Sequence, residues 1–163
     1  MGVREKGFSL IELLIVVAII LVVAAIAIPN LLRSRMAANE ASAVASLRAV
    51  NTSETIYQTS YGVGYATGLT NLSDGGTPAN CNPPAVPATA SACLIDNSLA
   101  SGTKSGYTFA YAAIAVGGLN TSYTLNADPV TSGASGQRHF FTDQTNVIRV
   151  NVAAPASATD PAI

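Results

Sequence analysis

The stretch Leu13–Ile28 reads LLIVVAIILVVAAIAI and contains no charged or polar side chain. The apolar run reaches back to Phe8, with Glu12 as its one charged residue. Residues 8–28 in a helix that rises 1.5 Å per residue would be about 31 Å long, roughly the thickness of the hydrocarbon core of a bilayer. We therefore predict one membrane-spanning helix, because no comparable run follows Ile28.

The overall composition limits the function classes that fit this chain. It has 163 residues, enough for one domain plus one long extra element, and its net charge is -1 with 10% charged residues. A protein that holds nucleic acid through phosphate contacts needs a basic surface. The region beyond residue 60 offers only Lys104, Arg138 and Arg149 as cations, so we predict no nucleic-acid partner.

A secretory signal peptide is the alternative interpretation of the apolar run. Residues 1–6 would then be its charged segment, and Ala25-Ile26-Ala27 would be its small-residue cleavage site. Two features argue against this: the run is longer than a signal peptide needs, and Glu12 stands near its start. A charge at the centre of a membrane helix costs about 2.5–3.5 kcal/mol, and less near the end. Glu12 therefore either has a partner or reaches the lipid headgroups.

The segment Gly7-Phe8-Ser9-Leu10-Ile11-Glu12-Leu13 resembles the processing site of type IV pilins and of the related pseudopilins of type II secretion. The apolar helix and Pro29 follow at the family's usual distance, and the resemblance is strongest from residue 4 to about residue 60. It implies that a membrane-bound prepilin peptidase and N-methyltransferase cuts after Gly7 and methylates the new N-terminal Phe8. Residues 1–7 would then be a leader peptide.

The motif also makes physical sense. Glycine presents no side chain to a protease, and cleavage there exposes an α-amino group with a reference pKa of about 7.7–8.0. Glu12 lies about one helical turn from Phe8, so its carboxylate can pair with its own amine or with that of an adjacent subunit. The resemblance implies the neighbour's amine. A subunit out of step would leave both charges unpaired in an apolar medium, which makes Glu12 a candidate for setting the assembly register.

The helical pattern continues in a more polar form over residues 29–60. Apolar side chains recur at spacings of three, four, seven or eight: Leu32, Met36, Val44, Leu47, Val50, Tyr57 and Tyr61. The charged side chains are expected to face outward: Arg33, Arg35, Glu40, Arg48 and Glu54. Pro29 lacks an N–H and clashes with the preceding turn, so we predict a helix kink or a locally unwound segment there.

Residues 61–152 predict a globular head of α+β class, with glycine-rich loops followed by alternating segments. Four strands are expected: Tyr107–Ala113, Ser122–Asn126, Gln137–Thr142 and Val147–Asn151. An antiparallel sheet of about four strands would pack on the second half of the helix. Together with the membrane helix of residues 8–28 this is a pilin-like fold, and residues 153–163 are predicted to be a flexible tail.

The two cysteines, Cys81 and Cys93, lie beyond the span and predict one disulfide, with a metal site as the alternative. His139 has no nucleophile or paired carboxylates nearby in sequence and is expected to be a structural or a surface residue. Four carboxylates could contribute to a calcium site, although their spacing matches no loop motif: Asp74, Asp96, Asp128 and Asp143. We predict no catalytic residues, no metal, no cofactor and no enzyme activity.

The resulting prediction is a structural subunit of a type IV pilus that polymerises through its apolar helix. The resemblance implies an inner-membrane single-pass precursor that later joins an extracellular filament. Its implied partners are the peptidase, the lipid bilayer, an inner-membrane assembly platform, identical subunits and other pilins. A pseudopilin that forms a periplasmic piston for type II secretion is the alternative within the family. A monomeric membrane-anchored or secreted binding protein is the alternative from another class.

Overall fold

A computed structural model describes residues 7–77, 81 and 87–163, so residues 1–6 of the expected leader lie outside the described part. The chain divides into two compact units, residues 1–35 and residues 36–163. The first element, α1 (Leu10–Tyr61), continues from one unit into the other. The remaining elements belong to the second unit: α2 (Leu69–Leu72), α3 (Asn97–Ala100), β1 (Thr103–Lys104), β2 (Tyr107–Val116), β3 (Leu119–Pro129), β4 (His139–Asp143) and β5 (Arg149–Asn151).

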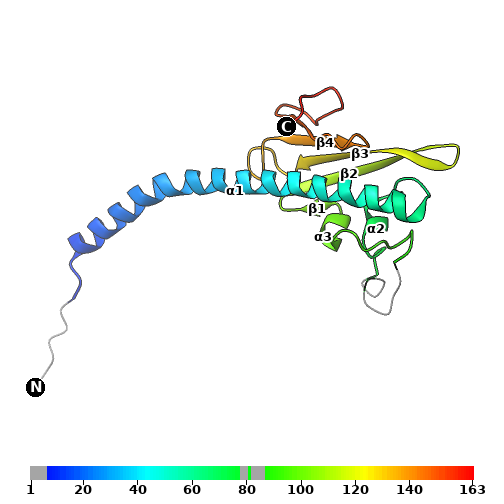
Figure 1. Cartoon of the computed structure of the whole chain (residues 1–163). Helices are drawn as coiled ribbons and strands as arrows, with labels where there is room; N and C mark the ends of the chain where they lie inside the picture. The colour runs from blue at the N-terminus through cyan, green and yellow to red at the C-terminus, as the bar shows by residue number, and fades with distance from the viewer. Residues whose placement is uncertain (1–6, 78–80, 82–86) are drawn as a thin grey trace, which may run out of the picture. The chain divides into compact units, whose positions relative to one another are not determined.

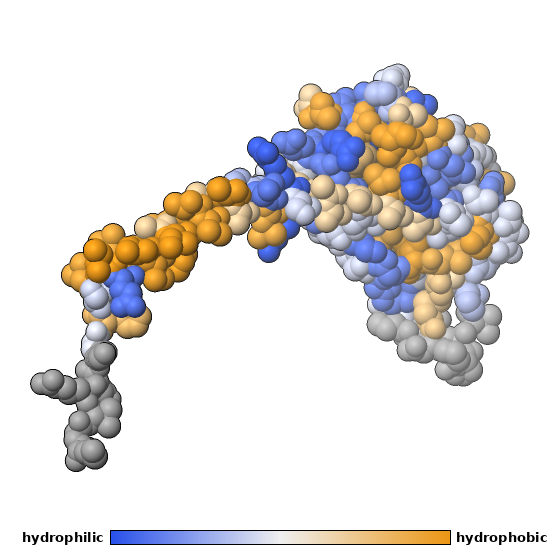
Figure 2. Space-filling model, turned by 60° about the vertical axis from the view of Figure 1, so that its left-hand side comes forward, coloured by the Kyte–Doolittle hydropathy of each residue, from blue (hydrophilic) through white to orange (hydrophobic). Residues whose placement is uncertain are grey.

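The first unit is the apolar part of α1, and its side chains have no packing partner in the described chain. Every large apolar side chain from Phe8 to Leu32 is exposed, and the orange surface in Figure 2 shows this apolar run. The helix is uninterrupted through Pro29, so no unwound segment is present there, and the kink remains a prediction. In an apolar medium a helix satisfies every backbone hydrogen-bonding group within one segment, which is why such a run folds this way.

The second unit is an α+β head in which the C-terminal part of α1 packs on an antiparallel sheet with strand order β1-β2-β3-β4-β5 (Figure 1). The buried side of the helix includes Ala43, Leu47, Val50 and Tyr57, spaced by three, four or seven residues. These side chains join Tyr107, Phe109, Leu125 and Phe140 of the sheet in one core. The predicted α+β, pilin-like fold is confirmed.

The predicted hairpin is formed by β2 and β3, which pair from Tyr107↔Pro129 to Val116↔Leu119. Its turn is Gly117-Gly118, and both residues have positive φ, 63° and 86°. Two positive φ values in a two-residue turn match the twist of the flanking strands, and glycine adopts them without strain. β1 covers only the first two residues of β2, and β4 pairs only with Thr124–Ala127. The outer half of the hairpin has no further named strand beside it, but Gly64 joins it through a parallel bridge to Asn120.

Two features of the head differ from the sequence prediction. The sheet has five strands, because Thr103–Lys104 adds a short β1 beside β2. The tail, expected to be flexible, runs back along β5: Val150 N–H donates to Pro161 O, and Ile163 N–H donates to Ile148 O, both at 3.0 Å. The physical reason is that an edge strand has unpaired backbone groups, and the backbone of the tail satisfies them.

The loop between α2 and α3 contains the disulfide. Cys81 and Cys93 are bonded to each other, with their Cα atoms 5.6 Å apart. Asp96 caps the N-terminus of α3 by accepting the Leu99 N–H at 3.0 Å. Tyr57 of α1 reaches the same loop, because its hydroxyl donates to Thr89 O at 2.8 Å. These contacts attach the loop to the helix.

Candidate processing and assembly site

The predicted cleavage point lies in backbone that directly precedes α1. Gly7, Phe8 and Ser9 are exposed and outside regular structure, and the Phe8 side chain is 77% exposed. Ser9 O accepts the N–H groups of Glu12 and Leu13 at 3.1 and 3.2 Å, which fixes the first turn of the helix. A peptide bond outside the helix and at its very start is open to an external protease.

The fold itself gives no reason for a glycine at position 7. A Cβ built on Gly7 would meet no atom within 4 Å, and its φ lies outside the positive range that favours glycine. Glycines with a clear local reason lie elsewhere in the chain: a Cβ on Gly64 would lie 2.3 Å from Asn120 O. A side chain at position 7 would therefore leave the described structure unchanged.

Glu12 lies in the first turn of α1 among exposed apolar side chains. Within residues 7–77, 81 and 87–163, no side chain forms a hydrogen bond or an ion pair with it. Its position at the helix N-terminus is electrostatically favourable, because the unpaired N–H groups there carry partial positive charge. The described residues thus supply no cation to this carboxylate.

The apolar side chains around Glu12 form the largest exposed apolar surface of the described chain. The α1 helix is long and apolar enough to cross a membrane, with a mean hydropathy of 3.3 over its most apolar 18-residue window and none of that window buried. Isolated exposed apolar residues are common on soluble proteins, but a contiguous run of this size marks an interface with lipid or protein. Such a surface can anchor a chain in a lipid bilayer, and it can pack against the helices of other protein molecules.

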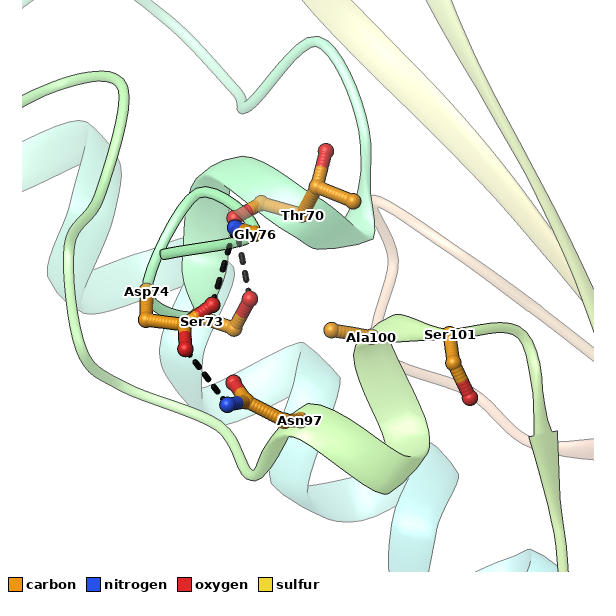
Figure 3. A pocket seen from close by; sticks show the side chains of 7 residues that line it. All are labelled: Thr70, Ser73, Asp74, Gly76, Asn97, Ala100 and Ser101. Carbon is orange, nitrogen blue, oxygen red and sulfur yellow. Dashed lines mark hydrogen bonds between the residues drawn. The ribbon is translucent and has the colours of Figure 1, made fainter. Parts of the chain in front are cut away.

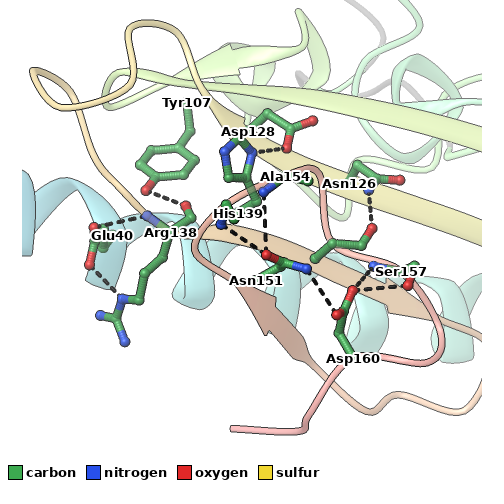
Figure 4. A network of polar contacts seen from close by, with 12 residues as sticks. Glu40, Tyr107, Asn126, Asp128, Arg138, His139, Asn151, Ala154, Ser157 and Asp160 are labelled. Atoms are coloured by element: carbon green, nitrogen blue, oxygen red, sulfur yellow. Dashed lines mark hydrogen bonds and ion pairs between the residues drawn. The ribbon is translucent and has the colours of Figure 1, made fainter.

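Glu40 anchors the base of the head, contrary to the prediction that it faces outward. Its carboxylate accepts Gln137 N–H at 2.9 Å and Arg138 Nε at 2.7 Å (Figure 4). Burial alone would raise the pKa of the Glu40 carboxyl, but these hydrogen bonds outweigh burial, and the pKa lies below its ordinary value. The ion pair ties the loop before β4 to α1.

Glu54 is also buried rather than outward, with no exposed surface. The Tyr111 hydroxyl lies 2.6 Å from Glu54 Oε1 and 2.8 Å from Ala66 O, and Ala66 N–H donates to Glu54 Oε2 at 3.0 Å. Burial raises the pKa of the Glu54 carboxyl, and the hydrogen bonds from Tyr111 and Ala66 offset this only in part. Glu54 thereby joins α1, the following loop and β2.

Sequence spacing could have identified both buried carboxylates. Glu40 stands three residues before Ala43, and Glu54 stands four residues after Val50, so both lie on the buried helix face. The same holds for Asn51, which donates to Thr142 Oγ1 and accepts from the Tyr123 hydroxyl, both at 2.9 Å. A polar residue that falls at the same helical spacing as the buried apolar residues indicates a buried hydrogen-bond network.

A shallow pocket of about 240 Å³ lies between α2 and α3 (Figure 3). Asp74 is buried there, where it accepts Gly76 N–H at 2.9 Å and the side-chain amide of Asn97. The pocket wall is completed by hydroxyl, methyl and backbone groups of Thr70, Ser73, Ala100 and Ser101. The carboxylate therefore stabilises the turn that forms the pocket.

The other acidic residues considered for calcium lie apart and have separate structural roles. Asp96 pairs with Lys104 at 2.7 Å, and although burial would raise its pKa, hydrogen bonds from Lys104, Ser98 and Leu99 hold that pKa at about 2. Asp128 contacts His139 at 2.6 Å, so the predicted structural histidine lies in a polar pair (Figure 4). No group of three or more His, Cys, Asp or Glu that could hold a metal occurs among the described residues.

The sequence of this chain is similar to those of known proteins. Residues 3–28 match the family model described as the prokaryotic N-terminal methylation motif. The chain is 43% identical over 96 residues to the type IV wide pilus major component PilA4 of Thermus thermophilus, which covers 56% of this chain and 72% of that protein. It is 47% identical over 51 residues to the type IV major pilin protein PilA of Myxococcus xanthus, which covers 31% and 23%. No solved structure matches the chain at a significant level.

Proposed function

This chain belongs to the type IV pilin family, and from that membership we propose that it is processed, exported and polymerised as a structural subunit of a pilus filament. The observation that carries the proposal is the exposed apolar part of α1 with Glu12 in its first turn. Such a surface needs a cover. Lipid covers it before assembly, and the corresponding helices of other subunits cover it in the filament.

Processing would prepare the subunit for assembly. A prepilin peptidase cuts the exposed peptide bond between Gly7 and Phe8, and the new amine of Phe8 is methylated. The amine then lies one helical turn from Glu12, within reach of the Glu12 carboxylate of a neighbouring subunit. Because each group is a lone charge in an apolar surrounding, pairing them favours one register between subunits over all others.

Location follows from the same features. The unassembled precursor is anchored in the inner membrane by one span, with its head on the outer side of that membrane. An assembly platform in the inner membrane then moves the subunit from lipid into a filament on the cell surface. The head, with its low charge and its disulfide between Cys81 and Cys93, becomes the outside of that filament.

The test is the intact mass and N-terminal sequence of protein recovered from sheared cell surfaces. A chain that starts at methylated Phe8 and lacks two hydrogens for the disulfide supports processing, export and assembly together. A chain that starts near Ile28 would mean removal of a signal peptide and would overturn the proposal.

A variant at the cleavage point sharpens this test. Gly7→Val should block processing, because a β-branched side chain crowds the scissile bond, and α1 itself should be unaffected since the position is open. Immunoblotting should show full-length precursor in the membrane fraction. Normal cleavage of this variant would contradict the assignment, and Gly7→Ala provides the control for a small side chain.

A further inference from the structure

The tail, residues 153–163, covers the outer edge of the sheet. β5 pairs with β4 on one side, and on its other side it forms an antiparallel bridge with the tail. Val150 N–H donates to Pro161 O at 3.0 Å, and Ile163 N–H donates to Ile148 O at the same distance. Without the tail, these backbone groups of β5 would form an open strand edge, which is the part of a sheet where other chains add.

The tail is attached less firmly than a regular strand. Pro161 has no N–H, so it accepts a hydrogen bond from Val150 but cannot donate one in return. The structure describes every residue of the tail, and Ala156 is the only buried one among them. A segment with few buried apolar contacts and exposed hydrogen bonds opens at a low cost in free energy. The tail can therefore leave β5 while the rest of the sheet stays folded.

Asp160 holds the tail in place through both of its carboxylate oxygens (Figure 4). Oδ1 accepts the side-chain amide of Asn151, the last residue of β5, at 2.9 Å. Oδ2 accepts the Ser157 N–H at 2.7 Å and the Ser157 hydroxyl at 2.9 Å. The backbone oxygen of Asp160 accepts Arg149 Nη1 at 2.8 Å. One residue thus closes the turn inside the tail and fastens that turn to β5.

These hydrogen bonds favour the ionised form of Asp160. The backbone N–H and the hydroxyl of Ser157, followed by the amide of Asn151, lower the pKa of the Asp160 carboxyl below its ordinary value of 3.8. The positive charge of Arg149 acts in the same direction. Asp160 is therefore a carboxylate at neutral pH, with two accepting oxygens. Asparagine has the same size, but it offers one accepting oxygen and one NH₂ group.

The start of the tail is anchored without Asp160. The Asn151 Oδ1 atom accepts the N–H groups of the first two residues of the tail at 2.9 and 3.3 Å. Asn126 Nδ2 donates to Ala156 O at 2.8 Å (Figure 4). These contacts end at Ala156. The part that covers β5, residues 157–163, therefore depends on Asp160 and on its own backbone pairing.

We propose that residues 157–163 are a releasable strap that closes the β5 edge to other chains, and that Asp160 is the latch that holds the strap shut. The strap is the occupant of the edge. An open edge, repeated on every copy of the chain, would let two copies pair edge to edge. The strap itself is poorly suited to such pairing, because it contains Pro161 and the charged Asp160. This inference concerns the folded head and does not depend on the proposed function.

The latch is tested by amide hydrogen exchange of the full-length chain in detergent, followed by NMR. Asp160→Asn keeps the size of the side chain and removes the oxygen that accepts from Ser157. We expect the amides of Val150 and Ile163 to exchange about tenfold faster, because the strap opens more often. The amide of Leu125, in the middle of the sheet, should exchange at the wild-type rate, which shows that the head stays folded.

Asp143→Asn is the matched control. Asp143 closes another turn in the same way, because its Oδ1 atom accepts the Thr145 N–H at 2.9 Å and the Thr145 hydroxyl at 2.5 Å. It forms no hydrogen bond with the tail in the described structure. The amides of Val150 and Ile163 should therefore exchange at the wild-type rate in this variant.

Closure of the edge is tested by chemical cross-linking of the same samples, with micelles in excess over chains. Asp160→Asn should give more cross-linked dimer than the wild type or Asp143→Asn. A synthetic peptide of residues 153–163 should lower the amount of dimer again, because it reoccupies the edge. Unchanged exchange in Asp160→Asn would overturn the latch. Faster exchange without extra dimer, or a dimer that the peptide does not reduce, would overturn the closure of the edge to other chains.

Discussion

Replacing Glu54 with glutamine should make the head more stable at neutral pH. The Tyr111 hydroxyl has one hydrogen but lies within hydrogen-bond distance of two oxygens, Glu54 Oε1 and Ala66 O. When Glu54 is ionised, one of these two contacts has no hydrogen. When Glu54 is protonated, it donates to Tyr111, and Tyr111 donates to Ala66 O, so every contact is satisfied. Glutamine keeps a donor to Tyr111 and an acceptor for the Ala66 N–H at any pH, and it adds one further amide hydrogen.

The direction in which stability changes with pH follows from the pKa of Glu54, which burial raises above its ordinary value of 4.5. The stability that this group contributes is complete below pH 4.5 and is lost as the pH rises through the raised pKa. Leaving one buried polar contact unsatisfied costs about 1–3 kcal/mol. Glu54→Gln should therefore exceed the wild type by about that amount at pH 8, and the two should be equal at pH 4.

The assay is urea unfolding of the full-length chain in detergent at both pH values. The chain has no tryptophan, so the signal is the near-ultraviolet circular dichroism of its tyrosines. Glu40→Gln is the matched control, and its effect on stability has the opposite pH dependence. Because the pKa of Glu40 is lowered, the stability that this carboxylate contributes is present above pH 4.5 and is lost as the pH falls. A Glu54→Gln head less stable than the wild type at pH 8 would refute the reasoning and show that Glu54 is held as a carboxylate.

Three further substitutions test other parts of the description. Leu47→Ala should destabilise the head by about 2–5 kcal/mol, because the side chain is fully buried between α1 and the sheet, and an unchanged urea midpoint would contradict this packing. Replacing Cys81 and Cys93 with serine should cost about 3 kcal/mol, and a reducing agent should destabilise the wild type but leave the variant unchanged. Glu12→Leu should still be inserted and cleaved but should give few filaments, as measured by comparing processed subunit in membranes with sheared material; normal filament yield would remove the registry role.

The parts of the fold that sequence predicts well are those with a repeated local signal. The apolar run up to Ile28 and the stripe from Leu47 to Tyr57 define α1, because a helix repeats its faces every three or four residues. The β2–β3 hairpin follows from alternation around Gly117-Gly118, a pair that a tight turn requires. Each of these signals is contained in a short window of residues.

The parts that sequence missed depend on contacts between distant residues. The strand Thr103–Lys104 has two residues and exists only because β2 offers it an edge. The tail binds β5 through backbone groups, which leave no side-chain pattern to recognise. Glu40 was expected at the surface because its partner Arg138 lies 98 positions away, and charge alone favours exposure until such a partner is known.

The buried carboxylates on α1 have a consequence for membrane insertion. Before the head has folded, the stripe that includes Leu47 and Val50 is an apolar surface on a helix continuous with the span, and lipid would compete for it. A carboxylate drawn to the bilayer centre costs about 2.5–3.5 kcal/mol, and the stripe contains two, Glu40 and Glu54. With α1 inserted as proposed, the residues that later hold the head together would add to Arg33 and Arg35, which precede them, in opposing movement of the helix into the bilayer.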